Sequence, residues 1–478
     1  MEIMSVIEAC FSALIIAGLT HWIYRWRNPK CNGVLPPGSL GLPLIGEALE
    51  LMIPSYSLNL LPFLKKRIQR YGKIFKTCVA GRTIIVSADP KFCHFIFQQD
   101  GKLFDAWSLD TFSKLFDQKT ANMSSIHRYI RTSVLRRFGM DALKQNLLSA
   151  MEEECRAALR SWSQQESLDI KYASGTMALE FSAKQLFSYD PQAEQSSEKL
   201  GDVYFLFTEG LMSIPLKLPG TAHYKCLQNH KKALSKIREI VKERIASPER
   251  SEEASDFLDH MICGMKTDKF LTEEFMTQLL FGLLFVTFDS VSTALSLAVK
   301  LLEEHPLVLQ ELIDEHEEVL KRRQTSDSLL TWNEYKSMTF TLHVINEVLR
   351  LANISPGLFR KVKQDVEVNG YTIPAGWGVM IATSALHMDP ETYKDPTTFN
   401  PSRWKDCKSE DMLKNFMPFG WGMKQCVGAE YSRVLLATFL HVLVTRYQWK
   451  LVKGGEVCRA PMLKFRKGLH INFLQKHM

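Results

Sequence analysis

The longest apolar stretch of the sequence, Leu271–Glu304, constrains the fold more than any other feature. Thr272 is a suitable N-cap, acidic residues follow it in the first turn, and Pro306 ends the pattern, so the stretch predicts one helix. At about 1.5 Å per residue this helix would be about 50 Å long, too long for a small domain. A transmembrane helix is the alternative. Asp289 and the hydroxyl-bearing residues near it favour a buried helix through the core of a large domain.

A glycine-rich loop with one cysteine, F-G-W-G-M-K-Q-C-V-G, covers Phe419–Gly428 and leads into an apolar stretch near Ala429. Its three glycines allow a tight turn without side chains in the way. Free N–H groups and the start of a helix would stabilise a thiolate at Cys426, which makes this residue a candidate metal ligand. A buried free cysteine is the alternative. Zinc is disfavoured, because no second cysteine or histidine lies at ligand spacing nearby.

The residues Phe419, Gly422, Cys426 and Gly428 reproduce the pattern F-x-x-G-x-x-x-C-x-G, and at this point the chain resembles the cytochrome P-450 family of heme-thiolate enzymes. The resemblance implies a mainly α fold with small β-sheets, a long central helix across the heme and an N-terminal transmembrane anchor. It also implies that Cys426 is the axial ligand of heme b, iron protoporphyrin IX. Phe419 and Gly420 would lie beside the cofactor.

The long helix carries V-T-F-D-S, which lines up with the family's pattern (Ala/Gly)-Gly-x-(Asp/Glu)-Thr. An acid beside a hydroxyl in an apolar helix can relay protons, so we expect catalytic roles for Asp289, Ser290 and Thr287. The chain departs from the pattern, since Val286 and Thr287 replace small residues and Ser290 replaces threonine. The alternative is that these hydroxyls bond back to the carbonyl four residues earlier.

A buried ion-pair cluster is expected from two further segments. Glu347 and Arg350 are three residues apart in T-L-H-V-I-N-E-V-L-R-L, and the apolar residues around them imply burial, where an ion pair must be fully satisfied. Arg403 in F-N-P-S-R-W supplies a second arginine. Together they match the family's Glu-Arg-Arg structural lock behind the heme.

The resemblance also implies contacts to the heme propionates. Arg131 matches the arginine of the family's W-x-x-x-R pair, and His127 stands in the place of the tryptophan. Arg360 fits P-x-x-x-R and would bind a carboxylate in planar bidentate geometry. Lys424 stands where arginine is usual, so it would act as a point charge.

The N-terminal residues from about Ile3 to Tyr24 are largely apolar, near the ~20 residues that cross a bilayer. Basic residues follow at once, which puts the N-terminus in the lumen, and a retained anchor is favoured over a removed signal peptide. We therefore expect an anchor with a basic stop over 1–30, a proline-rich hinge over 31–47 and a heme-thiolate catalytic domain over 48–478. By resemblance, the protein is a single-pass protein of the endoplasmic reticulum membrane with a cytosolic catalytic domain.

Composition limits the classes of partner and the compartment that are expected for this protein. Ten cysteines without framework spacing argue for a reducing compartment, and a net charge of +7 is too mild for nucleic-acid binding. The sequence has no dinucleotide-binding fingerprint. Electrons from NADPH must therefore come through another protein, which the resemblance identifies as NADPH-cytochrome P-450 reductase.

Shorter patterns predict local structure. Lys76–Ser87 and Leu463–Asn472 alternate like strands, and Gly370–Gly376 reads as a strand followed by a turn. The apolar stretch Gly210–Gln228 contains two prolines and cannot be one helix. It forms either a lid, a segment that dips into the bilayer or a plain turn.

The best-matching stretches resemble plant enzymes that oxidise triterpenoids of the cucurbitane and oleanane types, and also brassinosteroid oxidases. We expect hydroxylation of a triterpenoid C–H bond with dioxygen. A steroid hydroxylase is the alternative, and an oxygen-independent heme-thiolate isomerase is a more distant one. Apolar walls would suit such a substrate. The residues expected in the substrate pocket are Phe285, Phe288, Asn353, Ile354, Ser355, Leu358 and Phe465.

Overall fold

The computed structural model describes residues 2–109, 113, 115, 123–192, 198–247, 256–323, 325, 327–405 and 410–476. They form two compact units. The first unit comprises Met1–Ser55, Asn59–Ser108 and Ser355–Thr392, and the second comprises Tyr56–Leu58, Leu109–Ile354 and Tyr393–Met478.

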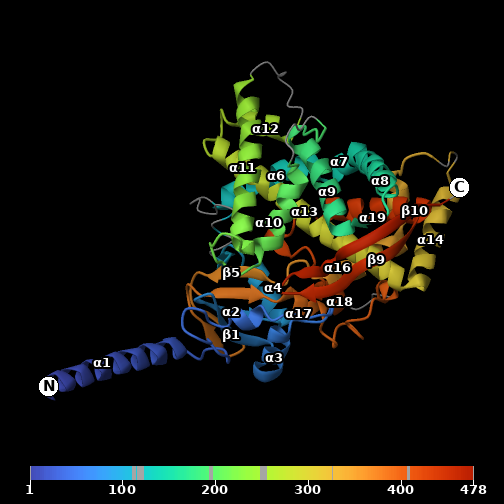
Figure 1. The fold of residues 1–478 in the computed structure, drawn as a ribbon. Coiled ribbons are helices and arrows are strands. Elements are labelled where there is room, and N and C mark those ends of the chain that lie inside the picture. Colours follow the sequence, from blue (N-terminus) through green and yellow to red (C-terminus); the bar gives the residue numbers. More distant parts are fainter. Residues whose placement is uncertain are drawn as a thin grey trace. The chain divides into compact units, whose positions relative to one another are not determined.

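The first unit contains a five-stranded mixed sheet with the order β1-β2-β8-β5-β3 (Figure 1). β1 and β2 form an antiparallel hairpin, which confirms the strands predicted over residues 76–87. Ala80 and Gly81 at its turn have φ of 50° and 77°, as a tight two-residue turn requires. A two-stranded sheet, β6 with β7, confirms the strand predicted near Gly370. The strands are β1 (Ile74–Val79), β2 (Arg82–Ser87), β3 (Phe104–Ala106), β5 (Leu358–Val362), β6 (Val366–Val368), β7 (Tyr371–Ile373) and β8 (Gly378–Ile381), and the helices are α1 (Glu2–Arg27), α2 (Ala48–Leu51), α3 (Pro62–Tyr71), α4 (Pro90–Gln98) and α17 (Thr383–His387).

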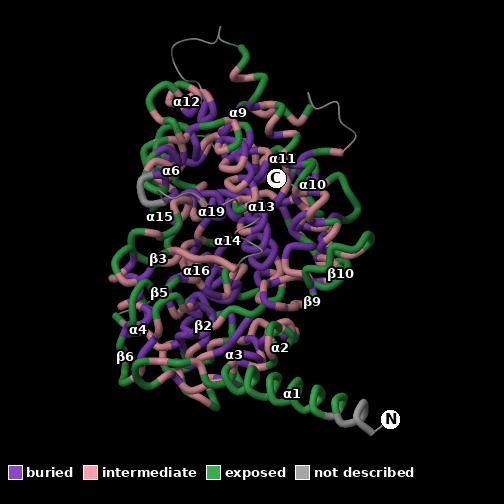
Figure 2. Tube along the Cα trace, turned by 90° about the vertical axis from the view of Figure 1, so that its left-hand side faces the viewer, coloured by how far each residue is buried: buried purple, intermediate pink, exposed green. Residues whose placement is uncertain are grey.

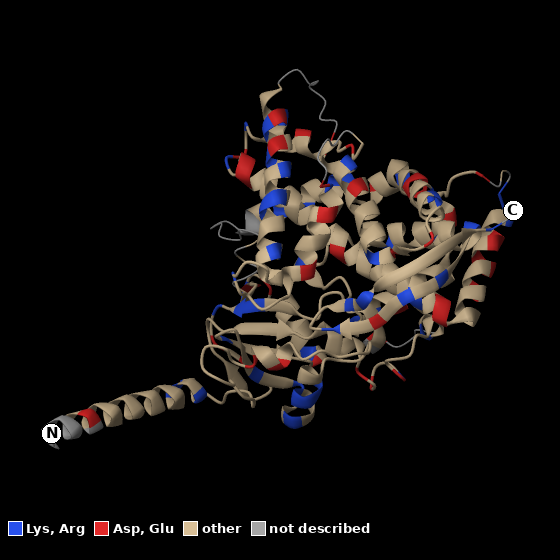
Figure 3. Cartoon of the chain, viewed as in Figure 1, with Lys and Arg blue, Asp and Glu red and all other residues tan. Residues whose placement is uncertain are grey.

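The N-terminal helix α1 has 26 residues. It has no charged residue between Glu8 and Arg25, and Figure 3 shows its charges near the two ends. Large apolar side chains such as Phe11 and Leu14 are exposed. Among the described residues, α13 meets the length and hydropathy expected of a membrane span. The division into anchor, hinge and catalytic domain stays a prediction.

The second unit is mainly helical and includes a three-stranded sheet with the order β4-β10-β9. The β9–β10 pair confirms the strand pair predicted at the C-terminus. The segment over 212–221 separates α10 from α11, so the stretch with two prolines is indeed not one helix. The elements are α6 (Met123–Phe138), α7 (Met140–Ala142), a π-helix η1 (Leu143–Leu147), α8 (Leu148–Trp162), β4 (Leu168–Asp169), α9 (Ile170–Phe187), α10 (Leu200–Leu211), α11 (Ala222–Ala246), α12 (Phe257–Gly264), α13 (Glu273–Glu304), α14 (Pro306–Lys321), α15 (Trp332–Ser337), α16 (Thr339–Ala352), η2 (Pro401–Trp404), α18 (Glu410–Asn415), η3 (Gly422–Lys424), α19 (Ala429–Arg446), β9 (Tyr447–Arg459) and β10 (Leu463–Gln475).

The long helix α13 runs through the core of the second unit, as the sequence predicted. Its 32 residues begin after Thr272, whose hydroxyl accepts from the N–H of Phe275, and they end before Pro306. It packs against α9, α11 and α16, and every residue from 291 to 299 is buried (Figure 2). In its apolar window, 67% is buried inside the protein. A helix that is apolar all round needs such surroundings.

A buried histidine pair joins three helices of the second unit. The Nδ1 atoms of His316 on α14 and His441 on α19 are 3.0 Å apart. Thr341 on α16 donates its hydroxyl hydrogen to Glu315, O···O 2.6 Å, so it must accept from Nε2–H of His316 at 3.0 Å. His316 is therefore the neutral Nε2–H tautomer, and its Nδ1 accepts from His441. Burial lowers the pKa of His316 to about 3 and that of His441 well below its usual value.

This pair predicts a loss of stability in mild acid. The folded pKa of His316 lies below the unfolded value, so the unfolded chain takes up the proton first as the pH falls below about 6.5. Each such histidine lowers the free energy of unfolding by about 1.4 kcal/mol at pH 5.5. The urea midpoint should therefore fall less between pH 7.5 and pH 5.5 in His316→Gln than in the wild type. The amide of the glutamine keeps one donor and one acceptor. Equal drops in both proteins would contradict the assignment.

Candidate heme-thiolate site

The loop that carries Cys426 is closed by its own backbone. The N–H of Cys426 donates to the carbonyl of Phe419, N···O 2.8 Å. Gly420 and Gly422 have φ of 71° and 74°, a left-handed conformation that glycine adopts without strain. Gly428 differs from the expectation, because its φ of −89° needs no glycine. A Cβ on it would lie 3.9 Å from the Cys426 sulfur, an ordinary van der Waals contact.

The thiol of Cys426 has opposing influences on its protonation. Its side chain is exposed towards the pocket, yet the surrounding chain displaces enough water to raise its pKa. The N–H of Gly428, which donates to the sulfur, and the charge of Arg131 both lower that pKa. A cation bound at the sulfur would favour the thiolate outright.

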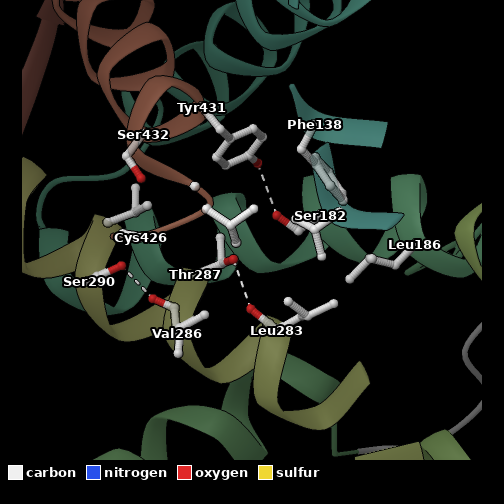
Figure 4. Close-up of a pocket in the computed structure, with 14 residues that line it drawn as sticks. Phe138, Ser182, Leu186, Leu283, Val286, Thr287, Ser290, Cys426, Tyr431 and Ser432 are labelled. Carbon is white, nitrogen blue, oxygen red and sulfur yellow. Dashed lines mark hydrogen bonds between the residues drawn. The ribbon is translucent and has the colours of Figure 1, made fainter. Parts of the chain in front are cut away.

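Cys426 opens onto a pocket with walls from α6, α9, α13 and the start of α19 (Figure 4). The walls are largely apolar, with a few hydroxyl groups. Thr287 and Ser290 lie on the α13 wall, so the structure brings both of these predicted residues to the same pocket as the cysteine. The lining residues are Val134, Phe138, Ser182, Leu186, Leu283, Val286, Thr287, Ser290, Val291, Cys426, Val427, Gly428, Tyr431 and Ser432.

The two hydroxyls of the α13 wall bond to their own helix. Thr287 donates to the carbonyl of Leu283, O···O 2.9 Å, and Ser290 donates to that of Val286 (Figure 4). The alternative of back-bonding is therefore what the structure contains. Each hydroxyl oxygen keeps lone pairs, so these groups can accept a hydrogen bond in the pocket while their hydrogens stay on the helix.

Asp289 is not a lining residue of this pocket. It is buried, and its carboxylate lies 3.7 Å from the ammonium group of Lys171 on α9. No sequence pattern predicts this partner, because Lys171 is far away along the chain. Asp289 directly precedes Ser290 in sequence, but its carboxylate faces Lys171 on another side of α13.

Phe288 and Phe285 pack inside the second unit. The Phe288 ring is fully buried, 6.4 Å from Tyr204 between ring centroids. A Cβ on Gly175 would lie 2.9 Å from that ring, so the close packing with α9 depends on this glycine. Phe285 contacts Phe207, with ring centroids 5.4 Å apart. Phe288 thus belongs to the core on the sides described, rather than to the wall facing Cys426.

Sequence reasoning missed a polar pair in the pocket wall. The hydroxyls of Ser182 and Tyr431 are 3.0 Å apart (Figure 4). Burial raises the pKa of Tyr431 far above its usual value. Tyr431 follows Cys426 by five residues, about one turn into α19, and that spacing is the one signal the sequence contains.

The predicted ion-pair cluster forms in the second unit. The carboxylate of Glu347 accepts two hydrogen bonds from Arg350, at 2.8 and 2.9 Å, and one from Arg403 at 2.9 Å. Glu347 and Arg350 are fully buried. The sequence missed the N–H groups of Asn400 and Trp404, which donate to the same carboxylate at 3.0 Å. A fully satisfied carboxylate ties α16 to η2.

The other expected cofactor contacts in this unit lie near the loop. Arg131 on α6 donates to the carbonyl of Gln425, N···O 2.7 Å, and His127 one turn earlier is exposed. Lys424 ends η3 and is half-buried. The guanidinium of Arg433 on α19, which sequence reasoning missed, lies 5.2 Å from the Phe419 ring centroid.

Arg360, Ser355 and Leu358 belong to the first unit. The Arg360 guanidinium is buried and lies 3.3 Å from the carboxylate of Asp100. Leu358 pairs with Ile381 across β5 and β8. The roles of these three residues at the heme or the substrate stay predictions.

The other expected pocket residues belong to the second unit. Asn353 ends α16 with φ of 42° and is buried, and Ile354 beside it is half-buried. Phe465 on β10 is buried opposite Val457. Their contact with a substrate also stays a prediction.

The donor set fits heme. In the described part of the chain, no three His, Cys, Asp or Glu side chains gather as a metal-binding group. A metal held by Cys426 alone must bring most of its own ligands, as iron does in a porphyrin. The apolar walls suit a flat macrocycle, and the Gly428 N–H stabilises a thiolate. These features define a heme-thiolate protein.

Comparison with known proteins identifies the family. The chain belongs to the cytochrome P-450 family, whose sequence pattern matches residues 36–471. It is therefore a monooxygenase with a heme-thiolate cofactor.

Several plant enzymes are similar over nearly the whole chain. Beta-amyrin 16-alpha-hydroxylase CYP87D16 of Maesa lanceolata is 48% identical, over 97% of this chain and 98% of that enzyme. Cucurbitadienol 11-hydroxylase of Siraitia grosvenorii is 47% identical, over 97% and 98%. Cholesterol 22-monohydroxylase CYP90B52 of Paris polyphylla is 34% identical, over 95% and 96%. Retinoic acid bound cyanobacterial CYP120A1 has a similar fold, with a TM-score of 0.79 and 25% identity over 93% of this chain and 100% of that one. This likeness agrees with the mainly α fold predicted.

The Glu347 cluster predicts a large stability difference between two glutamate variants. Glu347→Gln leaves the buried Arg350 and the partly buried Arg403 without a counter-charge, which should cost about 3–5 kcal/mol of unfolding free energy and lower the heme content. The control Glu318→Gln breaks an exposed pair with Arg322 and should cost less than about 1 kcal/mol. Urea unfolding and heme per protein give both values. Similar losses in the two variants would show that the cluster is not a structural lock.

Proposed function

We propose that this protein hydroxylates a C–H bond of a triterpenoid, with dioxygen and with electrons from NADPH. The observation that carries the proposal is Cys426 at the apolar pocket faced by the hydroxyls of Thr287 and Ser290, in a chain 47–48% identical to two triterpenoid hydroxylases. Identity to cholesterol hydroxylases is lower, at 32–34%. A steroid is therefore the second candidate substrate.

The heme would be held by Cys426 and supplies the activation of dioxygen, from which one atom enters the substrate and the other leaves as water. The chain's own residues bind, orient and supply protons. Arg131 and Lys424 bring positive charge to the loop beside Cys426, as the propionates of heme require. Arg360 is proposed for the same role by its match to the family pattern, and His127 by its position one turn before Arg131.

Proton supply would use the polar side of α13. Thr287 and Ser290 keep free lone pairs in the pocket, and they can hold a water molecule there. Asp289 adjoins Ser290 and is held by Lys171. A carboxylate that exchanges between Lys171 and water can return protons to that position.

We further propose a membrane location with a separate electron donor. α1 would anchor the chain in the endoplasmic reticulum membrane, the segment 31–47 would act as a hinge, and residues 48–478 would form the cytosolic catalytic domain. The basic residues that close α1 support this orientation. NADPH-cytochrome P-450 reductase would supply the electrons.

The function is tested by expressing the full chain in yeast with a plant reductase and supplying beta-amyrin, cucurbitadienol or cholesterol. We expect an oxygenated triterpenoid, identified by mass spectrometry and NMR, and no product from Cys426→Ala, which lacks the thiolate spectrum. If cholesterol is the only substrate that is oxygenated, the proposed substrate class is a steroid and not a triterpenoid. Conversion by microsomes isolated from these cells, without added NADPH, would instead indicate an oxygen-independent isomerase.

Asp289 is predicted to affect coupling rather than heme binding. Asp289→Asn keeps the shape of the side chain but cannot return a proton, so turnover should fall by about 100-fold while hydrogen peroxide per NADPH rises. The control Lys300→Met, on the same helix, removes an ammonium paired with Glu304 and should leave both values unchanged. Normal turnover in Asp289→Asn would remove Asp289 from the proton path.

A further inference from the structure

Arg459, the last residue of β9, is a buried cation held by backbone carbonyls. It is 1% exposed, and burial lowers the pKa of its guanidinium to about 10. Nη2 donates to the carbonyl of Leu351 at 2.8 Å, and Nη1 donates to those of Ala352 at 2.9 Å and Asn353 at 3.4 Å. Within the described residues, Nε has no hydrogen-bond partner. No ion pair involving Arg459 occurs there either.

The three carbonyls are the C-terminus of α16. The last carbonyls of a helix have no partner inside the helix, and this end has partial negative charge. Asn353 turns the chain here with φ of 42°, and its N–H donates to Leu349, N···O 3.3 Å. The guanidinium of Arg459 therefore donates to helix carbonyls that would otherwise bind water. The partial negative charge of the helix end takes the place of a carboxylate as its counter-charge.

The same arginine stands where β9 turns into β10. Arg459 is paired with Leu463 across the two strands, and the N–H of Ala460 donates to the carbonyl of Met462 at 3.1 Å. Phe465 is two residues beyond Leu463, on β10. The Arg459 side chain thus joins two segments that are distant in sequence, the end of α16 and the end of β9, which leads into the turn.

Stability alone does not explain a guanidinium at this place. A buried charge with an unsatisfied donor is unfavourable, and a well-packed apolar side chain of similar volume is often as stable or more stable. What the guanidinium adds is geometry, because its planar donors fix the positions of several carbonyls at once. Earlier on α16, Glu347 already holds the helix in place through its ion pairs with Arg350 and Arg403.

We propose that Arg459 is a positioning residue that determines which carbon of the substrate is oxidised, by fixing Asn353 and the β9–β10 turn relative to each other. The inference rests on the proposed function and on the expected substrate pocket, which includes Asn353, Ile354 and Phe465. A rigid polycyclic substrate offers many similar C–H bonds, so a small displacement of such a wall changes the carbon that is presented.

The test compares wild type with Arg459→Met, Arg459→Lys and the control Arg446→Met, each as the full heme-containing chain with a plant reductase. Arg446 at the end of α19 is paired with exposed Asp327 and makes none of the contacts of Arg459 with the end of α16. The measurements are the carbon-monoxide spectrum of the thiolate heme, KM and kcat, and the product ratio. The product ratio is the ratio of the hydroxylated isomers formed from beta-amyrin, and likewise from cucurbitadienol. Amide hydrogen exchange at residues 351–354 and 460–463 is measured without substrate.

Arg459→Met should keep the thiolate spectrum, change the product ratio by about threefold or more, raise KM more than it lowers kcat, and speed exchange in both segments. Arg459→Lys, which keeps a cation and donors but not the planar fork, should restore part of the wild-type ratio. Arg446→Met should match wild type. An unchanged ratio and unchanged exchange in Arg459→Met would overturn the proposal.

Two outcomes separate this inference from the proposed function. If wild type oxidises neither triterpenoid, the proposed substrate class fails, and the product ratio is measured with cholesterol while the exchange result stands by itself. If Arg459→Met loses its heme, the ratio and exchange of Arg459→Lys decide, and wild-type values for both would overturn the positioning role.

Discussion

The hydrogen bond from the N–H of Cys426 to the carbonyl of Phe419 is the contact on which the site depends. It closes a loop in which Gly420 and Gly422 adopt left-handed conformations, and it points the sulfur into the pocket. The Gly428 N–H then stabilises negative charge on that sulfur. A single protein ligand is sufficient because the heme brings the other donors to iron.

Two sides of α13 have different surroundings near this sulfur. One side presents Thr287 and Ser290 to the pocket, and their hydrogens are bound to the helix itself. The neighbouring positions Phe288 and Asp289 are buried against other helices, where Lys171 meets the acid. Consecutive residues on a helix point in directions about 100° apart, so an acid next to a serine in sequence need not share its surroundings.

α16 is held near its C-terminal end by two kinds of charge interaction. Glu347 gathers two arginines and two further N–H groups, whereas Arg459 binds the carbonyls of the last turn. The first interaction satisfies a buried anion with side chains, and the second satisfies a buried cation with backbone dipoles. The chain that leaves α16 at Asn353 therefore starts from a fixed point.

The sequence by itself determined the elements and the position of the cysteine loop. The period and length of Leu271–Glu304 gave α13 almost to the residue, because capping and proline act locally. The spacing of glycines around Cys426 gave the loop, and apolar residues around Glu347 gave a buried ion pair. These conclusions need only neighbours within a few positions.

Tertiary structure alone decided which side chains meet. Lys171 reaches Asp289, Tyr431 reaches Ser182, and Arg459 reaches the end of α16 across long stretches of sequence. Phe288 became a core residue because Gly175 on another helix leaves room for its ring. Periodicity shows that a residue is buried but not what buries it, since the partner is chosen by the packing of elements that are remote along the chain.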